Sequence, residues 1–492
     1  MTSRIQPRTY TIDDFAKRSA LILYLSIMVL ILAGVPILVF VWGLEEALLA
    51  AISLVLVLVL LLPIVSTRNY DIFQPLSFVF LSAFVGVTLR TLYVLLFPDN
   101  MTTWDLLQGH GASFLAPALL AVVLGMSFYV VGYVQGTVRL PLGRFKIAKY
   151  DDWNEKRLFI IVILFASISV IATGALLRST GFSIQDLSDL SSLSRKRYLV
   201  VEGTVTGYAA QGYLRWASSL GAQAFLLYMA WFSYFRKRWF STHGLILGVL
   251  FVVAGFSPFA TSNRGVLMWV LLSSMIIWHY LRKKLSRRTI LLSLMLALFI
   301  VSFMLNLRGG HQQPAVGSRI GGIIEDLVAS RDLLDITTTA IIIDALHSGK
   351  LNYQYGSTYL TWLYAPIPRT VWRDKPIISV GAIVRESAFG YGGRGGIPPG
   401  ILGEAYWNFG VVGLIFVLWF MGFLTRVMYE SMQLPDGAHP NLVILYAVVI
   451  APWSLASIGG GWSGAFITAL QSAIPLMIVL SFITRKPRNI GK

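Results

Sequence analysis

Arginine is the residue type with the greatest potential for chemistry in this chain, because it gathers in two segments between apolar stretches, residues 178–216 and 307–403. A guanidinium group is always charged and offers a planar fork of donors that fits two phosphate oxygens at once. These arginines indicate a site for a polyanionic ligand, although pairing with nearby carboxylates or lipid head groups explains any single one equally well. They are Arg178, Arg195, Arg197, Arg215, Arg308, Arg319, Arg331, Arg369, Arg373, Arg385 and Arg394.

Three further charged residues lie at or inside the apolar stretches themselves. Arg264 stands in the short Ser262–Gly265 segment between two of them, where a charge held near hydrocarbon is a candidate functional group. Glu404 lies where the chain re-enters the membrane, and an unpaired carboxylate there is costly. An arginine partner and a role in proton transfer account for Glu404 equally well. Arg90 lies a short way inside an apolar stretch, and snorkelling to the interface is the favoured explanation.

The sequence gives little support for a metal or nucleotide site. His311 and His347 have no second histidine or carboxylate at a metal-binding spacing. The chain has no cysteine, and it carries neither a phosphate-cradling loop nor the serine elbow of the α/β hydrolases. We therefore expect no metal and no cofactor.

Membrane-spanning helices must position these residues. Of the 492 residues, 56% are hydrophobic and 13% are charged, whereas soluble domains have about 25% charged residues. The apolar residues come in blocks of about 18 to 23, the length that a helix needs to cross a bilayer. The fold class is therefore all-α and polytopic, with about twelve transmembrane helices. The expected spans are 19–41, 47–66, 75–97, 112–135, 158–177, 217–235, 243–261, 265–281, 289–306, 407–425, 441–458 and 464–484.

Basic residues predict the orientation of these spans. The net charge is +17, but the lysines and arginines form short clusters between spans, which is typical of topology signals and argues against nucleic-acid binding. Most of the 40 lysines and arginines fall on one side of the membrane. We expect a single membrane domain over residues 1–492 with both termini cytoplasmic, so that segments 178–216 and 307–403 lie on the outer face.

The two outer segments are too long to be simple connections. Residues 183–193 begin with a capping box and residues 320–332 carry an apolar stripe, so each segment is expected to contain a helix. Residues 353–403 are rich in glycine, proline and aromatic residues, a composition typical of mobile loops. This stretch is expected to form a lid or a substrate channel.

Several short motifs resemble those of the Wzy-type polymerases of oligosaccharide repeat units. They are Gly356–Tyr359, Ile367–Arg369, Trp372–Pro376, Gly403–Gly410 and Ser262–Gly265. The resemblance implies a bacterial inner-membrane glycosyltransferase with a GT-C-like helical fold and a large periplasmic loop. Its donor would be a growing glycan on undecaprenyl diphosphate, and its acceptor would be one further lipid-linked repeat unit, both on the periplasmic face.

The resemblance, taken together with the arginines, gives roles to particular residues. A lipid diphosphate leaves in such a reaction, and arginines fixed at the membrane surface would stabilise the developing charge without a metal. The expected diphosphate ligands are Arg264, Arg369 and Arg373, helped by Lys375 and Arg385. The residues expected to guide the substrate are Arg195, Arg197 and Arg215.

The acceptor sugar needs other partners. Its hydroxyl group requires a base or an orienting acceptor, for which Glu404 is the first candidate and His311 the second. Aromatic side chains could stack on sugars, and anchoring at the membrane interface is at least as good an explanation for them. They are Tyr359, Trp362, Trp372, Tyr406 and Trp407.

Two other functions are considered beside the polymerase. The related O-antigen ligase would transfer the same donor to a lipid A core acceptor. A transporter of the lipid-linked unit belongs to another class, and the sequence has neither a repeat between its halves nor a matching pair of broken spans to support it. The expected partners are the bilayer, the lipid-linked donor and acceptor, and, as a candidate, a chain-length regulator protein.

Overall fold

The structure is a computed structural model, and it describes most of the chain. The described residues are 43–67, 70–97, 112–142, 146–179, 212–260, 264–286, 288–293, 333–367, 371–376, 380–389, 396–434 and 439–485, with a few isolated positions. The expected spans 19–41 and 289–306 lie largely outside them. The helices expected within residues 183–193 and 320–332 also lie outside, apart from Val328.

Within this part of the chain the protein is helical and built to cross a membrane. Eight helical stretches there are long and apolar enough to span a bilayer. They are α2 (Leu44–Ser66), α3 to α4 (Pro75–Ala83 and Arg90–Leu96, joined by the π-helical segment η1, Phe84–Leu89), α5 (Ala116–Gln135), α7 (Glu155–Ser179), α10 (Thr242–Ala260), α17 (Gly400–Met432), α18 to α19 (Pro440–Leu445 and Ala451–Gly460, joined by the π-helical η8, Tyr446–Ile450) and α20 (Trp462–Ile483). The all-α polytopic class is thus confirmed, while the count of twelve spans and the GT-C-like fold stay predictions.

Two more helices lie where spans are expected. They are α9 (Gly212–Tyr234) and α11 (Arg264–Leu281). Helix α9 is more polar than the eight stretches above, and residues 220–233 are all buried, apart from one half-buried alanine, because α7, α10 and α11 pack around it. A helix enclosed by other helices does not need a lipid-facing surface.

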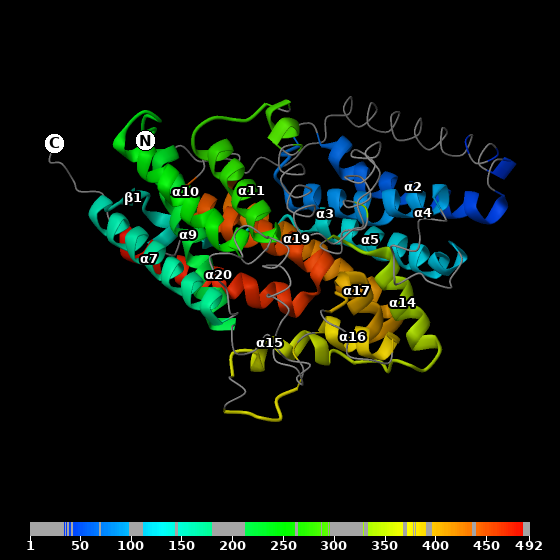
Figure 1. Ribbon diagram of the computed structural model, residues 1–492. Coiled ribbons are helices and arrows are strands. Elements are labelled where there is room, and N and C mark those ends of the chain that lie inside the picture. Colours follow the sequence, from blue (N-terminus) through cyan, green and yellow to red (C-terminus); the bar gives the residue numbers. More distant parts are fainter. Residues whose placement is uncertain are drawn as a thin grey trace, which may run out of the picture.

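The helices share two large hydrophobic cores, and a third, smaller cluster includes Ile342, Val384 and Trp407. One core joins α7, α9, α10, α11 and α20 with the π-helical η8, and the other joins α2, α3, α5, α14 (Ile336–His347), α17 and α19. In Figure 1, α7, α9 and α10 lie on the left, α2, α4 and α5 lie on the right, and α17 and α19 run between the two groups. Helices α14, α15 (Thr361–Tyr364) and α16 (Val380–Phe389) gather at one end of the molecule, which we call the loop end.

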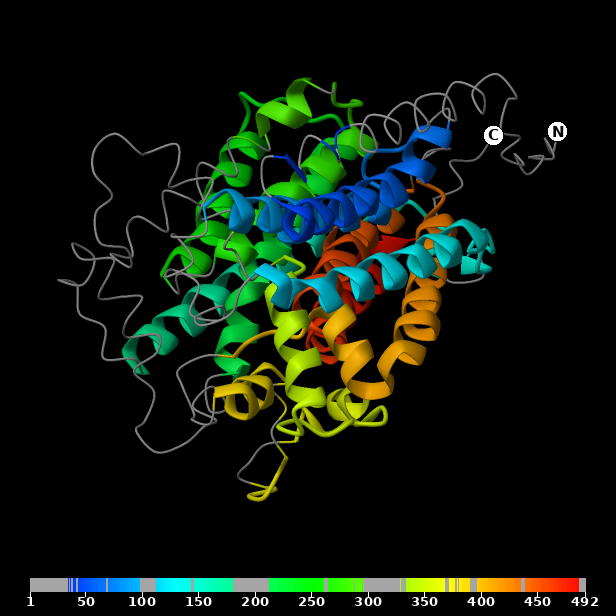
Figure 2. The same ribbon diagram turned by 90° about the vertical axis from the view of Figure 1, so that its right-hand side faces the viewer.

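Helix α17 doubles back on itself at Gly410, as the orange ribbon of Figure 2 shows. Gly410 has φ 60° and ψ −143°, a backbone conformation that is essentially restricted to glycine. The two arms lie in close contact. A Cβ added to Gly413 would lie only 2.2 Å from the carbonyl oxygen of Ala405. Residues 400–409 therefore form a short inserted helix, and only residues 411–432 form the crossing arm. The span expected at 407–425 lies within the candidate span Gly400–Met432, and its bounds stay a prediction.

A buried ion pair fastens α14 to the membrane helices. Arg90 pairs with Asp335, and the two side chains are only 1% and 4% exposed. The Arg90 Nε also donates to the carbonyl oxygen of Val328 at 2.7 Å. Snorkelling of Arg90 is therefore wrong, because its guanidinium points into the protein. Nearby, the backbone of Gly86 in η1 touches the carbonyl of Leu334, where a Cβ would collide.

The same aspartate begins α14. Its carboxylate accepts hydrogen bonds from the backbone N–H of Thr337 at 2.9 Å and from the hydroxyl of Thr338 at 3.0 Å, as an N-cap residue does. Burial raises the pKa of Asp335, but the charge of Arg90 and the hydrogen bonds of Thr337 and Thr338 outweigh burial and lower the pKa below its ordinary value. Asp335 is therefore ionised, so the pair joins a negative carboxylate to a positive guanidinium.

Polar contacts also tie the opposite end of the bundle. The carboxylate of Asp71 accepts the hydroxyls of Tyr280 and Tyr429, and Glu430 pairs with Arg426 at 2.6 Å and with Arg139 at 3.2 Å. A two-stranded ladder, β1 (Asp152–Trp153) against β2 (Thr484–Arg485), joins the start of α7 to the end of α20. Basic residues from three segments, Arg139, Arg426 and Arg485, thus share this end.

Replacing Arg90 by alanine should destabilise the protein strongly. Removing one partner of a buried pair leaves an uncompensated charge and costs about 3–5 kcal/mol. The matched control is Arg139→Ala, because Arg139 is 39% exposed and such a pair contributes about 1 kcal/mol or less. The measurement is denaturant unfolding of both variants in detergent micelles. Equal losses in the two variants would contradict the assignment of Arg90.

Candidate functional site

The carboxylate of Glu404 is the centre of the candidate site. Glu404 lies on the inserted helix 400–409 and is 0% exposed. Its Oε2 accepts the backbone N–H of Trp462 at 2.6 Å, and Trp462 is the first residue of α20. The start of a helix has unpaired N–H groups and a positive dipole end, so an anion is stabilised there. One oxygen of Glu404 is thus used to hold α20.

The other oxygen of Glu404 is uncommitted. Its Oε1 is buried and makes no hydrogen bond of normal geometry among the described residues, although the Thr358 hydroxyl lies near enough to favour the charged carboxylate. No arginine in the described part of the chain pairs with Glu404. Since a buried polar atom without a partner costs free energy, Oε1 is the atom of this site that is best placed to meet a substrate.

Tyr359 lies beside Glu404. It belongs to the 3₁₀ segment η6 (Ser357–Leu360), and its ring stacks on Phe409 with 6.4 Å between centroids and meets Trp462 edge-on at 6.0 Å. Its hydroxyl is buried and has no partner among the residues that the structure describes. Burial, and then the charge of Glu404, raise the pKa of Tyr359 well above its ordinary value. The phenol therefore keeps its proton and can only approach Glu404 as a neutral donor.

Asn408 joins the segment that carries Tyr359 to the helix that carries Glu404. Its Oδ1 accepts the backbone N–H of Gly356 at 2.7 Å, and its Nδ2 donates to the hydroxyl of Thr358 and to the carbonyl of Glu404, both at 2.8 Å. Asn408 is fully buried. The motif segments Gly356–Tyr359 and Gly403–Gly410 thus meet in space through this one amide. Asn408 is not among the site residues expected from the sequence, although a polar residue four positions after Glu404 in an apolar helix lies on the same helix face.

Aromatic rings extend from Tyr359 along the loop end. Trp462 stacks on Phe466 with 4.8 Å between centroids, and Trp362 meets Phe466 edge-on at 5.0 Å. By contrast, the expected stacking residue Trp407 is fully buried and donates its Nε1–H to the carbonyl of Asn352 at 2.9 Å. Trp407 is therefore a core residue, whereas Trp462, which was not among the expected residues, is partly exposed.

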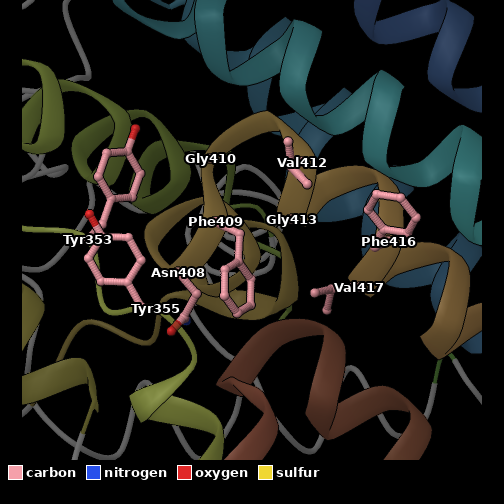
Figure 3. A pocket seen from close by; sticks show the side chains of 9 residues that line it. All are labelled: Tyr353, Tyr355, Asn408, Phe409, Gly410, Val412, Gly413, Phe416 and Val417. Carbon is pink, nitrogen blue, oxygen red and sulfur yellow. The ribbon is translucent and has the colours of Figure 1, made fainter.

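A groove adjoins the site at the bend of α17. It has a volume of about 510 Å³, and Figure 3 shows its polar end at Tyr353, Tyr355 and Asn408 and its apolar end beyond Phe409. Its lining residues are Tyr353, Tyr355, Asn408, Phe409, Gly410, Val412, Gly413, Phe416 and Val417. Val412 and Phe416 are 59% and 66% exposed on the crossing arm. The groove therefore opens on the exposed apolar surface of the crossing arm.

Several expected ligands of the diphosphate belong to the loop end. Arg373 and Trp372 are exposed on one turn, and Trp372 meets Tyr364 edge-on at 6.0 Å. Lys375 is 6% exposed and donates to the carbonyls of Ala365 at 2.8 Å and Ile367 at 2.6 Å. These two bonds hold the turn that leads toward Arg373.

Other expected residues lie on the helices around this turn. Arg215 is in the first turn of α9, which is tied to the loop by the hydroxyl of Tyr213 and the carbonyl of Pro366 at 2.8 Å. Arg385 is half-buried on α16, which packs on α14. Tyr406 is nearly buried, with its hydroxyl 3.5 Å from Nε2 of His347.

Some expected residues cannot be compared with the structure. Arg195, Arg197, His311 and Arg369 lie outside the described residues, and for Arg264 only the backbone is described, at the start of α11. Helices α9 and α10 run antiparallel, since Phe225 meets Phe251 and Tyr228 meets His243. Helix α11 therefore begins at the end where α9 begins, which is the loop end. The described residues contain no cluster of His, Asp or Glu that could hold a metal ion.

Comparison with known proteins gives one match. A family model described as putative O-antigen polymerase matches residues 206–462. The matched segment is more than half of the 492-residue chain and contains both motif segments that meet at Asn408. No curated protein and no solved structure matches the chain.

Replacing Asn408 by alanine should loosen the segment that carries Tyr359. The change leaves the Gly356 N–H and the Thr358 hydroxyl without their amide partner, at about 1–3 kcal/mol for each buried group. Hydrogen exchange should show faster exchange of residues 356–360 while α9 stays protected. Asn352→Ala is the control, because that side chain is exposed. Unchanged exchange at residues 356–360 would mean that Asn408 does not hold the two motifs together.

Proposed function

The chain belongs to the O-antigen polymerase family, and from that premise we propose that it polymerises lipid-linked oligosaccharide repeat units. The growing glycan would pass from undecaprenyl diphosphate to a sugar hydroxyl of the next lipid-linked unit. The observation that carries this proposal is the buried Oε1 of Glu404, which lacks a partner in the described structure and lies where the two motif segments meet.

The reaction needs one group to receive a proton and others to stabilise the leaving group. The acceptor hydroxyl oxygen attacks the anomeric carbon of the donor, and the bond from that carbon to the diphosphate oxygen breaks. Its electron pair stays on undecaprenyl diphosphate, and the hydroxyl proton passes to Glu404, which is positioned as a general base. His311 stays the second candidate from the sequence.

Arginines at the loop end are the proposed ligands of the leaving diphosphate. Guanidinium donors fixed before the reaction stabilise the charge that develops, and this requires no metal. The exposed position of Arg373 and the start of α11 at Arg264 support this role. Arg369 and Arg385 complete the proposed set, and Lys375 holds the turn through its two carbonyl contacts.

The groove at the bend of α17 suits the lipid part of a substrate. Its apolar end at Val412 and Phe416 is exposed where lipid would lie, and its polar end at Tyr353 and Asn408 adjoins Glu404 through the same inserted helix. An isoprenoid chain lying in it would enter sideways from the bilayer. Its diphosphate would then reach the loop end at membrane depth.

The proposed sidedness rests on the basic residues. Arg139, Arg426 and Arg485 share the end opposite the loop end, and basic residues near span ends favour the cytoplasm. We therefore place both termini in the cytoplasm and the loop end on the periplasmic face of a bacterial inner membrane. A lipid-carried donor fits that face, where cytoplasmic sugar nucleotides are absent.

Purified protein in vesicles with lipid-linked repeat units should produce a ladder of glycans. Glu404→Gln should slow the ladder about 10²- to 10⁴-fold, because it removes the base while keeping an oxygen that can accept the Trp462 N–H. The control is Glu386→Gln, an exposed carboxylate on α16. No ladder from folded wild-type protein would overturn the polymerase proposal, and an undiminished rate in Glu404→Gln would overturn the role of Glu404.

Arg264→Lys and Arg369→Lys should each lose activity although the charge is kept. Lysine lacks the planar fork that binds two diphosphate oxygens at once. The rate of transfer at saturating substrate should fall at least about 10-fold, consistent with the loss of one charge-assisted hydrogen bond of about 1.5–3 kcal/mol. The control is Arg139→Lys at the opposite end. Full rates in both loop-end variants would remove the diphosphate assignment.

A further inference from the structure

Two buried oxygen atoms at the candidate site lack hydrogen-bond partners within the described structure. They are Oε1 of Glu404 and the hydroxyl oxygen of Tyr359. Each such atom is costly to leave unsatisfied, and native proteins keep few of them. They belong to one site, because both side chains contact Trp462, Glu404 through the backbone N–H and Tyr359 through the ring edge. They do not bond to each other.

The two atoms have complementary chemistry. A carboxylate oxygen only accepts, and a phenol that keeps its proton can donate. A hydroxyl group is both donor and acceptor, so a single hydroxyl placed between the two atoms would satisfy both at once. A charged amine would satisfy only the carboxylate. It has hydrogen-bond donors but no lone pair, so it cannot accept the proton of the phenol. A sugar hydroxyl is the group that a glycan substrate supplies in abundance.

We propose that Tyr359 is a further catalytic residue, which donates a hydrogen bond to the same acceptor hydroxyl whose proton Glu404 receives. This inference rests on the proposed function. The hydroxyl oxygen has two lone pairs, so that one accepts from Tyr359 while the other attacks the anomeric carbon. The proton of the hydroxyl points at Glu404. The hydrogen bonds with Tyr359 and with Glu404 together fix the direction of attack.

The surroundings of Tyr359 support a fixed position for its hydroxyl. The ring is held between Phe409 and Trp462, and the segment that carries it is bound to Asn408 at the neighbouring Thr358. Ser463 also donates its hydroxyl to the carbonyl of Thr358 at 2.6 Å, which ties the segment to α20. Hydrogen bonds from the inserted helix and from α20 thus both fix Thr358, the residue before Tyr359. A preorganised donor loses little entropy on binding.

The position of the ring also gives the acceptor a way in. Tyr359 as a residue is partly exposed although its hydroxyl is buried, and Phe409, on which its ring stacks, lines the groove of Figure 3. The acceptor sugar would reach Glu404 past these two rings, which can stack on its face. Tyr359 would then discriminate among acceptors, since a site that binds a hydroxyl through both donor and acceptor strongly rejects a sugar that cannot place one there.

The test is Tyr359→Phe, measured by ladder formation and by thermal unfolding in detergent. Phenylalanine keeps the ring contacts and removes only the hydroxyl. We expect kcat/KM for the acceptor to fall about 10- to 100-fold, the effect of losing one hydrogen bond that binds and orients the attacking hydroxyl. The melting temperature should stay the same or rise, because a buried hydroxyl without a partner is removed. Tyr364→Phe, on the same loop but away from Glu404, should leave both quantities unchanged.

A double variant separates the proposal from a structural role. If both side chains act on one hydroxyl, the loss in Tyr359→Phe/Glu404→Gln should be smaller than the product of the two single losses. A full rate in Tyr359→Phe, or losses that multiply and accompany a lower melting temperature, would overturn the role of Tyr359. Absence of a ladder from the wild-type protein would instead overturn the proposed function on which this inference rests.

Discussion

The ion pair between Arg90 and Asp335 is the interaction on which the loop end depends. Both side chains of the pair are buried. Asp335 also caps the start of α14 and Arg90 also donates to the carbonyl oxygen of Val328, and only these added bonds offset the cost of burying the two charges. Helix α14 packs against the inserted helix 400–409, where a Cβ on Gly403 would come within 2.8 Å of Ile342. The pair therefore holds α14, α14 supports the inserted helix, and the inserted helix presents Glu404. A charge deep in one span thus sets the position of a carboxylate on another.

The break at Gly410 makes this arrangement possible. A continuous helix would carry Glu404 outward, away from the bundle, whereas the doubled chain places it at the start of α20 with one oxygen satisfied and one left over. Broken backbone at membrane depth is tolerated where protein surrounds it, and the inserted helix is buried except at Phe409. Strained positions of this kind gather at functional sites. The same bend forms the groove, so one glycine serves both the polar and the lipid-facing parts of the site.

The spans were predictable from the sequence because burial in lipid demands long apolar blocks, and their ends agree with α2, α7 and α20 within a few residues. Helix α14 was not predicted, since twelve residues are too few to span and it lies within a loop. The prediction that Arg90 snorkels was wrong because its partner, Asp335, is far away in the sequence. Glu404 was singled out because an unpaired carboxylate at the membrane costs free energy. Its contacts with Trp462 and Tyr359 depend on how α20 and η6 pack. The burial of Trp407 was not predicted, because composition does not reveal which face of a helix is turned inward.

The most direct test of the account is an experimental structure of the protein in lipid nanodiscs with a lipid-linked repeat unit bound. We expect a sugar hydroxyl within hydrogen-bond distance of Oε1 of Glu404, with the isoprenoid chain in the groove beside Phe416 and the diphosphate near the start of α11. A glycan bound elsewhere, with Glu404 still enclosed and out of reach of any sugar, would contradict it.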